Sequence, residues 1–406
     1  MTVITSSSFA SSVHGGATWR EAAKQVLDDL SDVMTEDHTF TLGFVYVTDH
    51  LAADVGAIIN LFQSVLGIKN WVGSIGIAVC GADKIYTDEI GIAAMITRME
   101  ADDFAIMKNP ADHTEWITEK QPVLVLSHAH PHKDYNDFDH NLKMIEEQTN
   151  GFLLGGVSLC RPDKIPDKMP VHDAINTSGG IDTIAFAGHV KIASMMSQGC
   201  KPIGEMHTIT RCDGVMIKAL DGMSPQDVFE NDLKNFATNK IGENPDNIIV
   251  EDADTIPDEY KAMFQGEVMT AFSLPDTDTN EMIVRPILGI NDNGTMMVQH
   301  HCEANERMMF VHRDDVTVAE DLSVELLNLR KRITHEYGEL TNGRIKGGIY
   351  ISCAARAFTD NGAANTSEIN LIRDILGEFP LAGFYSGGEI KGTRMYAFTG
   401  ILIIFL

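Results

Sequence analysis

Hydrophobic and polar positions follow one another along the chain in blocks that predict strands and helices in a recurring order. Residues 39–47 are rich in β-branched and aromatic side chains, which is typical of a strand, and residues 57–66 carry apolar side chains at helical spacing. Two further strands are predicted at 71–79 and 89–97, and the glycines of 71–79 indicate close approach of another backbone. The pattern therefore predicts a βαββ unit in this part of the chain.

The same order of elements is predicted twice more. The elements are a strand at 122–126, a helix at 137–148 and strands at 152–159 and 181–192, and then a strand at 348–353, a helix at 367–379 and strands at 381–390 and 395–405. In each case roughly thirty residues separate the first strand from the glycine-containing second one, which is long enough for a supersecondary unit. Copies of one unit usually pack into a shared sheet system, so we expect the segments VGS, GGVS and FYSGGE to lie close together.

These patterns predict an α/β fold with mixed β-sheets flanked by helices, built from repeated βαββ units in two linked modules. The first module spans residues 39–235 and the second spans residues 236–406. A helical lead-in, residues 1–38, precedes them and contains one amphipathic helix from Trp19 to Met34.

Charge and composition exclude several classes of partner. The 406 residues include 58 acidic and 31 basic side chains, a formal net charge of −27, which repels nucleic acid and anionic lipid. No apolar stretch approaches the roughly twenty residues that a bilayer span requires. The six cysteines form no CxxC pair and the first residues lack a secretory pattern, which favours a cytoplasmic protein. Neither a GxGxxG nor a GxxxxGK[ST] motif is present, so we expect no nucleotide cofactor.

Three short segments stand out by their order and spacing. They are SQGCKPIG at 197–204, CAAR at 353–356 and PLAGFYSGGEI at 380–390. Together they resemble the paired FIST (F-box and intracellular signal transduction) N-terminal and C-terminal domains, over nearly the whole chain from about residue 39. The resemblance implies a sensory protein that binds a small ligand such as an amino acid. Relatives often carry an output domain, for which this chain has no room, so we expect it to signal through a partner protein in trans.

Arg356 is the first candidate for a ligand contact. It follows an apolar strand where that strand meets a loop, and a guanidinium there can hold a carboxylate through two hydrogen bonds. Glu389 follows two glycines, which permit close approach, and it can accept a ligand ammonium or form an ion pair with Arg356. We expect the ligand to lie where the modules meet. The candidate ligand-binding residues are Arg356, Glu389, Tyr385, Gly387, Gly388, Cys353 and Ser158, with Cys200 and Gly199 approaching from the other side.

An enzyme is the alternative interpretation. Cys353 and Cys200 each lie in one of the three segments, where a thiolate is a potential nucleophile and a buried thiol simply fills space. His128 and His130 alternate at the end of a predicted strand, which places them on one face like an HxH metal pair. A hydrolase using either cysteine or a metal at these histidines therefore stays open, as does a solvated polar loop for the histidines. A third possibility is a protein-interaction scaffold without a ligand.

Overall fold

The chain folds into two compact units. The computed structural model describes residues 3–34, 39–130, 135–164, 169–172, 175–177, 180–241, 267–274, 281–341, 343–358 and 365–406. One unit comprises Met1–Gln198 with Leu322–Leu406, and the other comprises Gly199–Asp321. We call them the three-sheet unit and the barrel unit.

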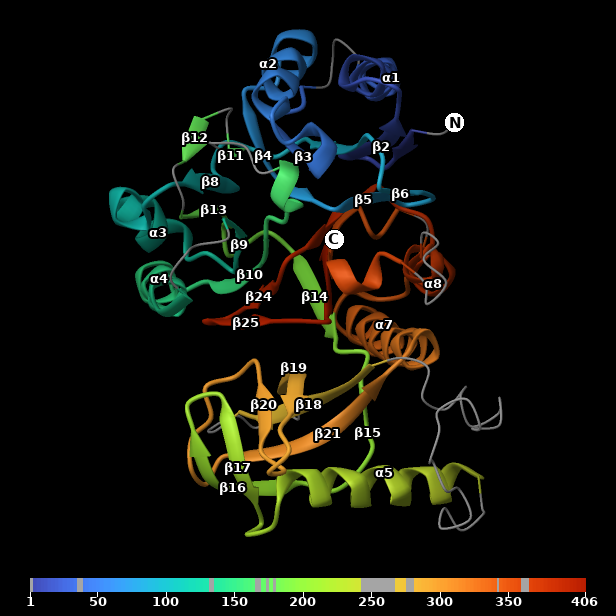
Figure 1. The fold of residues 1–406 in the computed structure, drawn as a ribbon. Helices are drawn as coiled ribbons and strands as arrows, with labels where there is room; N and C mark the ends of the chain where they lie inside the picture. Colours follow the sequence, from blue (N-terminus) through green and yellow to red (C-terminus); the bar gives the residue numbers. More distant parts are fainter. Residues whose placement is uncertain are drawn as a thin grey trace. The chain divides into compact units, whose positions relative to one another are not determined.

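Three mixed β-sheets form the framework of the three-sheet unit (Figure 1). The first sheet has the strand order β1 (Ile4–Thr5), β2 (Phe9–Gly15), β7 (Gly91–Thr97), β3 (Leu42–Thr48), β4 (Asn70–Gly76), β11 (Met169–His172), β12 (Ile175–Thr177). The second has the order β25 (Arg394–Tyr396), β24 (Glu389–Lys391), β10 (Phe152–Val157), β9 (Leu124–Ala129), β13 (Ile181–Phe186), β8 (Phe104–Met107). The third has the order β14 (Ile192–Ser197), β26 (Gly400–Phe405), β22 (Gly347–Cys353), β23 (Leu381–Ser386), β5 (Ala78–Gly81), β6 (Ile85–Thr87).

One hydrophobic core is shared by all three sheets. It contains buried side chains from β3 and β4 of the first sheet, β9, β10 and β13 of the second, and β22, β23 and β26 of the third. Phe405 joins them directly, because its ring centroid lies 5.2 Å from that of Phe9, 6.4 Å from Phe44 and 5.3 Å from Phe186. The sheets therefore turn their inner faces toward one another.

Helices cover the outer faces of these sheets (Figure 1). They are α1 (Trp19–Asp32) and α2 (Val55–Leu66) on the first sheet, α3 (Thr114–Lys120) and α4 (Tyr135–Thr149) on the second, and α8 (Ser367–Leu376) with the part of α7 (Asp315–Tyr337) from Leu322 on the third. The amphipathic pattern explains the packing of α1, whose buried side chains recur on one face from Ala22 to Leu30. Thr18 caps its start by accepting a hydrogen bond from the backbone of Glu21. None of the described helices is long and apolar enough to cross a membrane.

Each of the three predicted βαββ segments shows the same strand pairing. The strands before and after the helix pair in parallel, as β3 with β4, β9 with β10 and β22 with β23. The first strand also pairs antiparallel with a later one, as β3 with β7, β9 with β13 and β22 with β26. Mixed sheets flanked by helices are thus confirmed, whereas a repeated unit stays a prediction.

Four predicted strands were wrong in the same way, because each is two strands. The chain changes sheet between β4 and β5, between β13 and β14, between β23 and β24, and between β25 and β26. In each case both strands bury side chains within the same unit, and the few residues between them did not mark a break in the predicted strand. The predicted lead-in also holds more than a helix, because β2 pairs with β7 along its whole length.

A glycine stands at the closest approach of each parallel pair. A Cβ atom at Gly73 would lie 1.7 Å from the carbonyl oxygen of Val45, and one at Gly155 would lie 1.9 Å from that of Ser127. In the third pair, a Cβ atom at Gly383 would lie 2.1 Å from the carbonyl oxygen of Tyr350. Any side chain at these positions would force the two strands apart.

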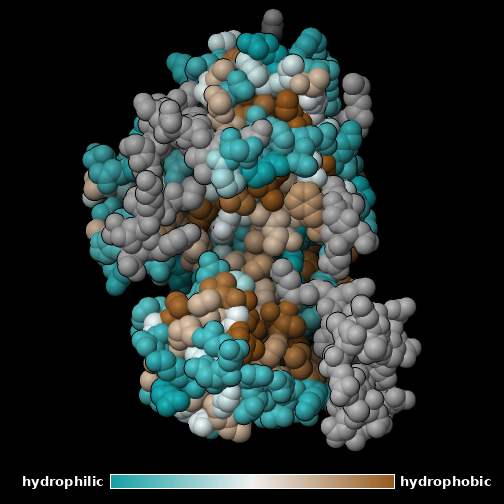
Figure 2. Space-filling model, viewed as in Figure 1, coloured by the Kyte–Doolittle hydropathy of each residue, from teal (hydrophilic) through white to brown (hydrophobic). Residues whose placement is uncertain are grey.

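The barrel unit is a closed six-stranded β-barrel, which the sequence patterns did not reveal. Its strands follow the order β21 (Arg307–Arg313), β16 (His207–Asp213), β17 (Met216–Leu220), β20 (Met296–Val298), β19 (Met282–Ile290), β18 (Glu267–Ser273), and β18 pairs back with β21. The short β15 (Lys201–Pro202) extends β21, and α5 (Pro225–Ile241) presents a mainly hydrophilic surface (Figure 2). Residue 235, the predicted module boundary, lies within α5, and that boundary stays a prediction.

Gly155→Ala tests the close approach of the parallel strands. We expect it to lower the free energy of unfolding by about 1–3 kcal/mol or more, because the added methyl group collides with the Ser127 carbonyl. Gly56→Ala in α2 is the matched control, since nothing lies within 4 Å of its added Cβ atom and alanine favours a helix. Urea unfolding measures both, and equal stability of the two variants would contradict the argument.

Candidate functional site

The carboxyl ends of the parallel strands meet within the three-sheet unit. The backbone nitrogen of Leu159, just after β10, donates to the carbonyl of Ile75 in β4 at 2.9 Å. The nitrogen of Gly387, just after β23, donates to the carbonyl of Val157 in β10, also at 2.9 Å. The three glycine- and serine-containing segments therefore lie together, as the sequence predicted. Ligands of open α/β sheets bind at this end of parallel strands, which makes the convergence the candidate site.

Arg356 lies beside this convergence, in a short 3₁₀ helix (Ala354–Arg356) that follows β22. Its side chain is fully buried, and its Nε lies 2.9 Å from Oε1 of Glu368 in the first turn of α8. Its Nη2 donates to Oγ of Ser197 at 3.0 Å, and Ser352 Oγ donates to the second oxygen of Glu368 at 2.9 Å. Sequence reasoning considered only Glu389 as an acidic partner, because no motif marks Glu368.

Glu389 is held by hydroxyl and backbone donors. Its Oε1 accepts from Ser386 Oγ at 2.6 Å, and its Oε2 accepts from the Thr399 hydroxyl at 2.8 Å and the Thr399 backbone nitrogen at 3.1 Å. The side chain is completely buried. Loss of water raises its pKa to about 7, against the opposing effect of these donors and of the Arg356 charge. Near neutral pH this carboxyl can exist in either protonation state.

The remaining candidates of the three-sheet unit surround the same convergence. Tyr385 is fully buried in β23, and its hydroxyl has no hydrogen-bond partner among the described residues. Ser158 is buried, and its Oγ lies 2.8 Å from that of Ser74. Cys353 ends β22 directly opposite Ser386 of β23 and is almost fully buried. The structure therefore gathers these side chains, together with the Gly387–Gly388 turn, around Arg356 and Glu389.

The other two candidates belong to the barrel unit. Gly199 has a φ angle of +66°, which favours glycine, and its nitrogen donates to Oδ2 of Asp321 at 2.9 Å. Cys200 is partly exposed. Their predicted approach toward Arg356 stays a prediction.

The two histidines are buried, so their interpretation as a solvated loop was wrong. His128 lies within β9, fully buried, with Nε2 3.3 Å from the Tyr46 hydroxyl, and burial lowers its pKa to about 3. His130 follows the strand with 5% of its surface exposed. In the described ranges no three His, Cys, Asp or Glu side chains are grouped so that they could hold a metal ion. Hydrolysis by a metal or a cysteine thus stays an untested alternative.

Comparison with known proteins matches two parts of the chain to two domains of one protein family. Residues 41–223 match the FIST N domain and residues 249–391 match the FIST C domain, and both matches extend into the barrel unit. Uncharacterized protein Mb0898c of Mycobacterium bovis is 24% identical over 243 residues, which cover 58% of this chain and 55% of that protein. Uncharacterized protein Rv0628c of Mycobacterium tuberculosis is 25% identical over 221 residues, covering 52% and 50%. The chain thus matches about half the length of these curated relatives.

Glu368→Gln tests the buried ion pair. It leaves the Arg356 guanidinium buried without a countercharge, so we expect the free energy of unfolding to fall by about 3–5 kcal/mol. Glu378→Gln, which neutralises an exposed carboxylate shortly after the same helix, is the control and should change stability little. Chemical denaturation compares the two, and similar small losses would show that the pair contributes nothing.

Glu389→Gln tests the raised pKa. Between pH 4.5 and about 7 the folded protein keeps a proton on Glu389 that the unfolded chain releases. The free energy of unfolding should therefore fall as pH rises through this range, by roughly 3 kcal/mol in total, and then level off. Other titrating groups contribute equally to both proteins and cancel in the difference. Denaturation curves from pH 4 to 8 measure it, and identical slopes for wild type and variant would refute the raised pKa.

Proposed function

Because the chain belongs to the FIST family, with an N and a C domain, we propose that it is a cytoplasmic sensory protein that binds a small ligand. The ligand is an amino acid or a similar small carboxylate. A separate partner protein recognises the change that ligand binding causes in this chain. The observation that carries the proposal is the meeting of parallel strand ends beside Arg356, Glu389 and Tyr385.

The chemistry of these three side chains suits an amino acid. A guanidinium holds a carboxylate, a buried carboxylate accepts an ammonium group, and the Tyr385 hydroxyl has hydrogen-bonding capacity that no described residue uses.

The ion pair supplies a route from binding to response. Arg356 already contacts Glu368, so a ligand carboxylate must compete with that side chain. Displacement of Glu368 would act on α8, whose first turn contains it. The ligand would thereby favour a second arrangement of α8, which is the kind of population shift that a partner can recognise.

Thermal unfolding with amino acids and small carboxylates tests the function, and Tyr385→Phe tests the site. A ligand at about 100 times its dissociation constant should stabilise the wild type by roughly 2.7 kcal/mol. Tyr385→Phe should be as stable as the wild type without ligand, because the lost hydroxyl has no described partner, yet it should lose most of the ligand effect.

Tyr86→Phe, in β6, is the matched control and should keep the full ligand effect. If none of the compounds stabilises the wild type, small-carboxylate sensing is refuted. If a compound stabilises wild type and Tyr385→Phe equally, the site lies elsewhere.

A further inference from the structure

A pocket of the three-sheet unit lies away from the strand convergence. It has a volume of about 510 Å³, which is within the range of small-molecule sites. Apolar side chains that include Phe9, Met99, Val190 and Phe405 form part of its lining. None of the candidate residues at the strand convergence lines it.

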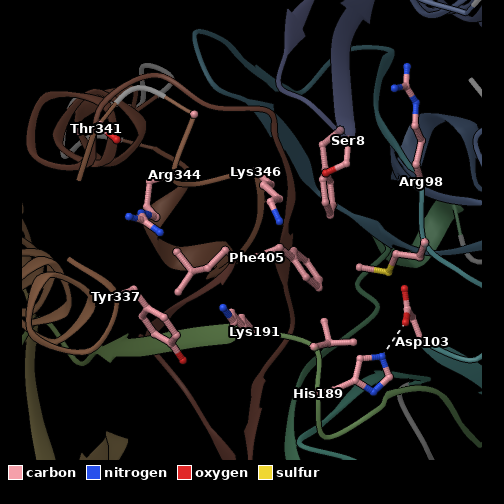
Figure 3. A pocket seen from close by; sticks show the side chains of 15 residues that line it. Ser8, Arg98, Asp103, His189, Lys191, Tyr337, Thr341, Arg344, Lys346 and Phe405 are labelled. Carbon is pink, nitrogen blue, oxygen red and sulfur yellow. Dashed lines mark hydrogen bonds and ion pairs between the residues drawn. The ribbon is translucent and has the colours of Figure 1, made fainter. Parts of the chain in front are cut away.

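Basic side chains line this pocket together with the apolar ones. Figure 3 shows Lys191, Arg344 and Lys346 around Phe405, whereas Arg98 points away from them. Arg98 instead stacks on Phe40, with its guanidinium carbon 4.5 Å from the ring centroid. Lys191 Nζ lies 5.7 Å from the ring centroid of Tyr337, which also lines the pocket, so all three cationic groups remain within the lining that an occupant would meet.

The structure describes no ion pair for these three cations. Among the residues that the structure describes, no Asp or Glu oxygen lies within 4 Å of Lys191, Arg344 or Lys346. The Nε of Arg344 is buried and has no hydrogen-bond partner there. The one acidic side chain in the lining, Asp103, is already paired with His189 at 2.7 Å.

Cations without an acidic partner are unexpected in a chain with such an excess of carboxylates. The chain has 58 acidic and 31 basic side chains, so carboxylates outnumber cations almost two to one. Three neighbouring cations without an ion-pair partner among the described residues leave a local positive potential, which water screens in part and which attracts a small anion. A small anion senses this potential within a Debye length of about 8 Å, while a large polyanion also meets the acidic remainder of the surface.

We infer that this pocket binds a small anion with at least two negative charges and a short apolar portion. Lys346 and Arg344 hold one anionic group, Lys191 holds another, and the apolar part packs against Phe405. The inference does not rest on the proposed function, because the pocket shares no residue with the cluster around Arg356.

Isothermal titration of the full chain with succinate, inorganic phosphate and acetate tests the inference. Succinate should bind at least about tenfold more tightly than acetate, and more tightly than phosphate, which has no apolar portion to pack against Phe405; added salt should weaken binding. Lys346→Ala and Arg344→Ala should each weaken binding about tenfold while the protein stays folded, because neither side chain has a described ion-pair partner.

Lys69→Ala removes an exposed lysine outside the pocket and should bind as the wild type does. Equal affinity of Lys69→Ala and Lys346→Ala would overturn the inference, and so would a preference for acetate. Tyr385→Phe separates the two proposals. Succinate binding that survives Tyr385→Phe but is weakened in Lys346→Ala belongs to this pocket, whatever the outcome for amino acids at the other site.

Discussion

The three-sheet unit depends on burying three apolar sheet faces in one core. Phe405 of the third sheet contacts aromatic rings of the first and second sheets, and the described strands change sheet repeatedly along the chain. No sheet can therefore cover its inner face without the other two, and the unit should unfold as a whole. The parallel pairs within the sheets also need glycine at Gly73, Gly155 and Gly383, where the partner carbonyl leaves no room for a Cβ atom.

The same packing creates the candidate site. Sheets that share a core bring the ends of their parallel strands together, so the loops leaving β4, β10 and β23 meet in the interior. Polar groups buried there must be compensated, which explains the contacts of Arg356 with Glu368 and Ser197 and the three donors to Glu389. The Tyr385 and Tyr350 hydroxyls have no hydrogen-bond partner among the described residues, so they are free to bond to a ligand.

Local pattern predicted the elements but not the connections between sheets. Strand and helix periodicity located β3, α2, β9, β22 and α8, and the glycine-containing segments predicted which strand ends meet. The changes of sheet were not predicted, because the pattern of apolar positions does not indicate which sheet a strand joins. The barrel was not predicted from the sequence, because its closure depends on the pairing of β18 with β21. Glu368 was not predicted as the partner of Arg356, because only the fold brings the two residues together.

The two charged regions of the three-sheet unit differ in how their cations are neutralised. Arg356 is deeply buried, and without Glu368 its desolvation would cost several kcal/mol, so the fold supplies the countercharge itself. Lys191, Arg344 and Lys346 remain in contact with solvent, where water can compensate them and the fold requires no acidic partner. A ligand at Arg356 must displace an internal carboxylate and thereby alter the structure, whereas a ligand at the pocket only replaces water. The buried cluster is thus suited to transmit a signal, and the open pocket is suited to hold an anion with little change in the protein.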